Sequence, residues 1–76
     1  MTKIECVDLG RGQYRVRVWD GRQFIAEHLP MASTSTSAIM IALGWIRSAG
    51  VILHATPEQA ASLADLDMAD RRGVRA

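Results

Sequence analysis

The first half of the chain alternates apolar and polar residues in three short runs, the pattern of strands that bury one face. The clearest run is 13–19 (QYRVRVW), flanked by weaker runs at 3–9 and 23–29. Glycine-containing segments at 10–12 and 20–22 separate the runs and are typical of turns. The central run divides into an apolar side with Tyr14, Val16 and Val18, and a polar side with Arg15, Arg17 and Trp19. Three consecutive antiparallel strands are therefore predicted.

The pairing of the second and third runs is open in the sequence. A two-residue loop places Val16 opposite Ile25, whereas a three-residue loop with Gly21 in a bulge places Val16 opposite Phe24. We favour the three-residue loop, because it keeps the large apolar side chains together on one buried face.

The pattern changes to helical spacing after Pro30, which has no N–H to donate and so ends the third strand. The run 32–37 (ASTSTS) is rich in residues that cap helices. A helix is predicted to begin within this run and to continue to about Ala49, with Gly50 as its C-terminal cap.

The rest of the chain predicts a short strand and a second helix. The apolar run 51–55 (VILHA) has the composition of a short buried strand. Thr56, Pro57 and Gln59 then form a helix start, with an N-cap, a first-turn proline and a capping-box glutamine. The helix should run from 57 to about 69. Its inner face is expected to contain Ala60, Leu63, Ala64 and Met68.

These elements predict an α+β fold in the order β-β-β-α-β-α. Three N-terminal strands and one short later strand would form an antiparallel sheet, with both helices packed on one face. We expect residues 1–70 to form a single domain and residues 71–76 to be a frayed tail. A domain of this size buries only about 60% of its unfolded surface, so a partner subunit is a common source of added stability.

Composition indicates which partners and which cellular compartment to expect. Its 76 residues carry nine basic and eight acidic side chains, a net charge of +1, which disfavours coating nucleic acid through bulk charge. Cys6 is the single cysteine, so no intrachain disulfide is expected and a reducing cytoplasm is the natural compartment. No apolar stretch has the length of a membrane span or a signal peptide. The sequence predicts a soluble protein.

Candidate catalytic chemistry is sparse. Potential metal ligands are Cys6, His28 and His54, without the paired spacing that zinc sites use. The serines of 33–37 lack a nucleophile motif and are better explained as capping residues. Acidic residues gather on the expected solvent face of the second helix, at Asp65, Asp67 and Asp70. We therefore expect no enzymatic activity, no metal and no cofactor.

The arginine-bearing strand is the strongest candidate for a binding surface. Arg15 and Arg17 project beside Trp19, with Arg22 at the hairpin end, and arginine with an aromatic residue can grip phosphates and stack bases. The strand-strand-strand-helix order is also similar to a double-stranded RNA-binding domain. Those domains place lysines at the start of the helix, where residues 35–40 (STSAIM) are uncharged. Direct nucleic-acid binding is thus the alternative, and protein binding is favoured.

The first predicted helix is apolar around much of its circumference. A single stripe packing on the sheet accounts for Ile39, Ala42, Leu43 and Ile46, but not for Met40, Ile41 and Trp45. Surplus apolar surface of this kind marks an interface, and a second copy of the chain is a candidate partner. The alternative is that the second helix covers Met40 and Trp45.

From Gly12 to Gln59 the chain resembles the small phage-encoded anti-CRISPR proteins, especially certain type I-F inhibitors. The resemblance is carried by the hairpin 14–22 (YRVRVWDGR), the small-residue loop before the helix, the helix ending in Gly44-Trp45, and the segments 51–53 and 57–59. It implies a non-enzymatic inhibitor, made in a bacterial cytoplasm, that binds a CRISPR-Cas effector complex or its nuclease and blocks DNA recognition or cleavage. The resemblance assigns no binding residues. We predict them from the pattern as Arg15, Arg17, Trp19 and Arg22, with help from Asp65, Asp67 and Asp70.

Overall fold

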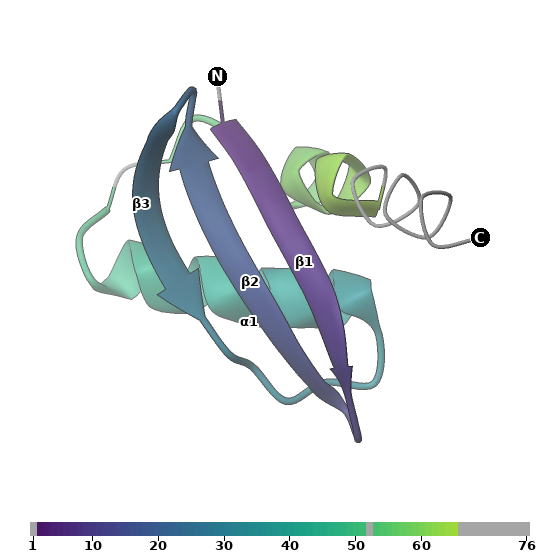
Figure 1. Cartoon of the computed structure of the whole chain (residues 1–76). Coiled ribbons are helices and arrows are strands. Elements are labelled where there is room, and N and C mark those ends of the chain that lie inside the picture. The colour runs from purple at the N-terminus through teal and green to yellow at the C-terminus, as the bar shows by residue number, and fades with distance from the viewer. Residues whose placement is uncertain (1, 52, 66–76) are drawn as a thin grey trace.

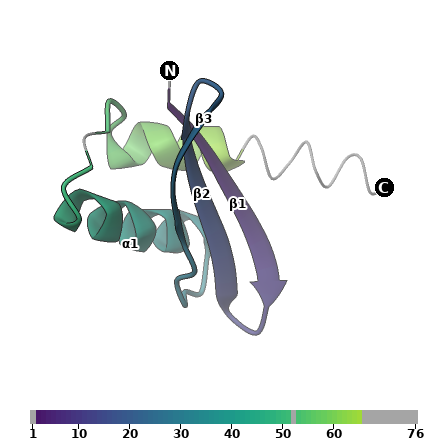
Figure 2. The same ribbon diagram turned by 60° about the vertical axis from the view of Figure 1, so that its left-hand side comes forward.

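The computed structural model describes residues 2–51 and 53–65, which form one sheet layer and one helix layer. Strands β1 (Thr2–Gly10), β2 (Gln13–Asp20) and β3 (Gln23–His28) make an antiparallel sheet in the order β1-β2-β3 (Figure 1). Helix α1 (Ser35–Ser48) and a second helix over residues 57–65 lie on the same side of this sheet (Figure 2). The predicted α+β class and the three antiparallel N-terminal strands are confirmed.

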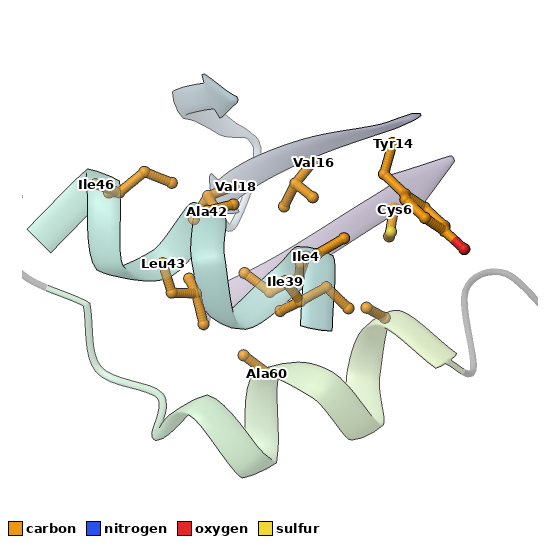
Figure 3. Close-up of a cluster of buried hydrophobic side chains, with 12 residues drawn as sticks. Ile4, Cys6, Tyr14, Val16, Val18, Ile39, Ala42, Leu43, Ile46 and Ala60 are labelled. Atoms are coloured by element: carbon orange, nitrogen blue, oxygen red, sulfur yellow. The ribbon is translucent and has the colours of Figure 1, made fainter. Parts of the chain in front are cut away.

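The core lies between the two layers and follows the predicted alternation. Val16 and Val18 of β2 are fully buried, and β1 places Cys6 opposite Val16 and Ile4 opposite Val18. The helix layer contributes small and branched residues from both helices (Figure 3). These are Ala38, Ile39, Ala42, Leu43 and Ile46 of α1, with Ala60 and Ala64 of the second helix. One face of the sheet is thus covered by both helices.

The pairing of β2 with β3 contradicts both predicted registers. Val16 lies opposite His28, and Val18 lies opposite Ala26. Asp20 pairs with Gln23, so the loop consists of Gly21 and Arg22. The predicted two-residue loop, Asp20-Gly21, lies one position earlier in the chain. Gly21 supplies the positive φ of 60° that the turn needs.

A bulge in β3 explains why the sequence pattern misled. Val18 pairs with Ala26 and Trp19 pairs with Phe24, so Ile25 is the extra residue. The bulge lets two large apolar residues follow each other in an edge strand. Phe24 consequently lies on the uncovered side of the sheet, 47% exposed, instead of packing over Val16.

Helix α1 begins and ends at the expected signals. The Thr34 hydroxyl caps the start by accepting a hydrogen bond from the Ser37 N–H at 3.1 Å. Gly50 follows the C-cap with a φ of 87°, and its N–H donates to the carbonyl of Arg47 at 2.9 Å. A left-handed glycine in this place satisfies a helix-end carbonyl at no steric cost.

The second helix begins with the predicted capping box. The Gln59 N–H donates to the Thr56 hydroxyl, and the Thr56 N–H donates to the Gln59 Oε1, both at 3.2 Å. Ala60 and Ala64 are buried as expected, and Leu63 is half-buried. The helix is described as far as residue 65. Met68, the domain limit at residue 70 and the tail 71–76 lie outside the described residues.

The predicted fourth strand over residues 51–55 is not confirmed. Val51, Leu53, His54 and Ala55 have no strand conformation, and residue 52 lies outside the described residues. The apolar side chains Val51, Leu53 and Ala55 are instead partly buried against the core. Apolar composition alone does not distinguish this packing against the core from strand pairing. In the part of the chain that the structure describes, no helix has the length and apolar character to cross a membrane.

Candidate binding surfaces

The outer face of the sheet, opposite the helices, carries three side chains of the predicted site. Alternation along β2 buries Tyr14, Val16 and Val18 and turns Arg15, Arg17 and Trp19 to the other side. Cross-strand pairing surrounds these three with residues of β1 and β3. We call this surface the outer face: Lys3, Glu5, Val7, Arg15, Arg17, Trp19, Phe24 and Glu27.

The middle row of the outer face alternates in charge. Arg17 lies between Glu5 of β1 and Glu27 of β3. Its Nε is 3.5 Å from the Glu27 Oε2, and both side chains are about one-third exposed. Exposed pairs of this kind contribute about 0–1 kcal/mol, because water solvates the separated charges nearly as well. The pair is therefore weak enough for a partner's charges to replace it.

The row nearest the β2–β3 turn is aromatic. The rings of Trp19 and Phe24 meet edge to face, with centroids 5.3 Å apart and planes at 70°. Lys3 lies on the other side of Trp19, and Arg22 is exposed in the adjoining turn. The sequence pattern did not identify Phe24 as a surface residue. The signal for it was the pair of large apolar residues at 24 and 25, which cannot both face the core in a regular strand.

Three donors on the outer face lack acceptors. The Nε atoms of Arg15 and Arg17 and the Nε1 of Trp19 are buried and make no hydrogen bond with the described residues. The Arg17 contact with Glu27 is thus an ion pair rather than a hydrogen bond. All three atoms belong to consecutive outward-facing residues of β2.

Asp65, the described acidic residue of the predicted site, does not lie on the outer face. Asp65 is exposed on the second helix and accepts a hydrogen bond from the Ser35 hydroxyl, at the start of α1, at 3.1 Å. It belongs to the helix layer, so the sheet separates it from Arg15 and Arg17. Asp67 and Asp70 lie outside the described residues.

The apolar surplus of α1 is exposed, as the helix pattern predicts. Met40 is 55% exposed, Ile41 42% and Trp45 64%. Trp45 stacks on His28 at the end of β3, with ring centroids 5.3 Å apart and planes at 25°. The alternative, in which the second helix covers Met40 and Trp45, is not confirmed by the described residues.

Reactive groups do not converge on a site within the described residues. Cys6 is buried in the core, and no three His, Cys, Asp or Glu side chains are grouped so that they could hold a metal ion in residues 2–51 and 53–65. A shallow pocket of about 490 Å³ lies beside the start of β1 and the second helix. The described residues that line it are Thr2, His54, Ala55, Gln59, Ser62 and Leu63.

A scan against protein-family models and searches of curated proteins and solved structures found no match.

Proposed function

We propose that this chain is a non-enzymatic protein that binds another protein through the outer face of its sheet. The observation that carries the proposal is the placement of Arg15, Arg17 and Trp19 side by side on the face of the sheet that no helix covers. Small side-chain movements would let their guanidinium and indole N–H groups donate to acceptors of a partner. Tryptophan and arginine are also the residues most enriched among those that dominate binding energies.

Charge distribution favours a protein partner over nucleic acid. Phosphates placed along the outer face would meet Glu5 and Glu27 on both sides of Arg17. The carboxylates would repel the phosphates. A surface that binds nucleic acid is expected to be basic throughout. A protein surface with both carboxylates and basic groups complements this alternating row.

The resemblance to type I-F anti-CRISPR proteins supplies the first target to test. In this proposal the chain is a phage inhibitor in the cytoplasm of the bacterial host, and its partner is a CRISPR-Cas effector complex or the associated nuclease. Occlusion is the mechanism, because a rigid sheet seated on the effector excludes DNA or prevents its cleavage. The acidic helix takes no part through Asp65, which lies in the other layer.

Charge reversal at Arg15 tests the surface. Arg15→Glu should weaken binding to purified effector by about 30-fold or more, as expected for loss of a dominant contact of about 2 kcal/mol. Arg11→Glu is the matched control, because Arg11 is exposed in the β1–β2 turn, outside the outer face. Circular dichroism should show the same fold for both. Equal affinities of the two variants would remove the outer face from the proposal.

The nucleic-acid alternative has its own experiment. A mobility-shift titration with RNA and DNA at two salt concentrations should show weak binding only. Tight binding that falls steeply with added salt would signal phosphate contacts and overturn the choice of a protein partner.

A further inference from the structure

The exposed side of α1 carries three large apolar side chains among small and hydroxyl residues. Met40, Ile41 and Trp45 are its large exposed side chains. The helix has a single charged residue, Arg47, whose Nη2 donates to the carbonyl of Ala55 at 3.2 Å. This contact holds the guanidinium at the connection to the second helix. Arg47 is therefore the single charge that a partner packed on α1 could meet, and α1 carries no acidic side chain.

We propose that the exposed side of α1 packs against the same side of a second copy of this chain. An apolar helix surface is complementary to itself, and a two-fold axis brings identical patches together. An aromatic side chain buries roughly 150–250 Å², so Trp45 at 64% exposure offers on the order of 100–160 Å².

The exposed apolar side chains would form the centre of such an interface, and polar residues around them would supply the remaining area. A stable interface needs about 800 Å² from each partner, with an apolar centre and a polar rim. Met40 and Ile41 extend the centre along α1 from Trp45. Leu29 is 48% exposed and follows His28, on which Trp45 stacks.

Gly44 lies where two crossing helices would come closest. Exposed residues recur along α1 at Ser37, Ile41, Gly44 and Ser48, spaced by four, three and four, which is the spacing of a helix–helix seam. A Cβ added at Gly44 would meet nothing within 4 Å. Glycine inside a helix costs about 0.5–1 kcal/mol relative to alanine, and no contact in the described monomer requires it. A helix of a second copy that crosses α1 at close range would require a residue without a side chain at this position.

The dimer would leave the outer face free, because α1 and the outer face lie on opposite layers. Each dimer would thus present two copies of Arg15, Arg17 and Trp19, and a target with repeated subunits would be bound with avidity. The dimer itself does not depend on the identity of that target.

Analytical ultracentrifugation over a wide range of protein concentrations tests the proposed dimer interface on α1. Wild type should show a reversible monomer–dimer equilibrium. Ile41→Glu should be monomeric throughout, because dimerisation would bury two carboxylates without partners. Ser62→Glu places the same charge on an exposed position of the second helix and should leave the equilibrium unchanged. A wild-type chain that is monomeric throughout, or an Ile41→Glu chain that dimerises normally, would overturn the proposal.

Gly44→Ala is a second test, because the substitution should change the stability of the monomer and the affinity of the dimer in opposite directions. The methyl group should stabilise the monomer to urea and weaken dimerisation at least several-fold. Unchanged or tighter dimerisation would exclude a close helix crossing at Gly44. Binding of the monomeric Ile41→Glu variant to the effector separates this inference from the proposed function, since each protomer keeps its outer face.

Discussion

Gly50 is a residue whose identity is set by backbone geometry alone. Its φ of 87° lies in the left-handed region, and nothing lies within 4 Å of a Cβ added to it. Gly50→Ala should therefore lower the free energy of unfolding by about 1–2 kcal/mol, through backbone strain rather than a clash. Urea denaturation measures the difference.

The matched control is Gly44→Ala, which adds the same methyl group to a helical backbone with equally open space. At concentrations where the chain is monomeric, it should raise the free energy of unfolding by about 0.5–1 kcal/mol. Loss of stability in the control, or none at Gly50, would contradict the role assigned to the left-handed φ.

Residue-level prediction worked where a strand is regular and failed where it is not. Period-two alternation placed Arg15, Arg17 and Trp19 on one face correctly, because β2 is the central strand and pairs on both sides. Phe24 could not be placed, because a bulge shifts the register of an edge strand and no glycine marks it in the sequence. The side chains that β2 contributes to the outer face were therefore predictable, and Phe24 of β3 was not.

At the scale of elements, the second helix depends heavily on its first turn. Its described residues contribute only alanines to the buried core, at 60, 61 and 64, so apolar burial holds it weakly. Thr56→Ala removes the hydroxyl that accepts from the Gln59 N–H and should cost about 0.5–2 kcal/mol. Hydrogen exchange should become faster in the amides of this helix before those of β2.

Ser62→Ala is the control for Thr56→Ala, because Ser62 is exposed on the same helix and makes no cap. Its amide exchange should match that of the wild type or be slower. Uniformly faster exchange across β2 and the helix in Thr56→Ala would show that the two elements unfold together, against a locally held helix.

The sequence predicted the helix starts correctly but not the strand pairing of the segment 51–55. Both helix starts were predictable, because a cap is a contact between residues at most three positions apart. The segment 51–55 was not, because whether an apolar run pairs as a strand or fills a gap depends on distant residues. Here its side chains pack on the core without strand conformation at the described positions.

At the scale of the whole molecule, the two layers have different surfaces. The sheet layer presents charged and aromatic side chains, whereas α1 presents large apolar side chains with Arg47 as its single charge. One surface suits a partner of mixed charge, and the other suits a copy of itself. A variant of one surface should therefore leave the function of the other intact, which makes the two proposals independently testable.

Thermal unfolding joins stability to the proposed dimer. If folded chains dimerise and unfolded chains do not, mass action stabilises the folded state as the protein concentration rises. Above the dissociation constant, each tenfold increase should add about 0.7 kcal/mol per protomer, or roughly 3–5 °C in Tm for a domain of this size. Ile41→Glu should unfold at the same Tm at every concentration. Trp19→Ala, on the outer face, should retain the dependence even if its Tm is lower throughout. If the Tm of the wild type did not depend on protein concentration, the exposed apolar side chains of α1 would face solvent in the folded monomer and the dimer would be excluded.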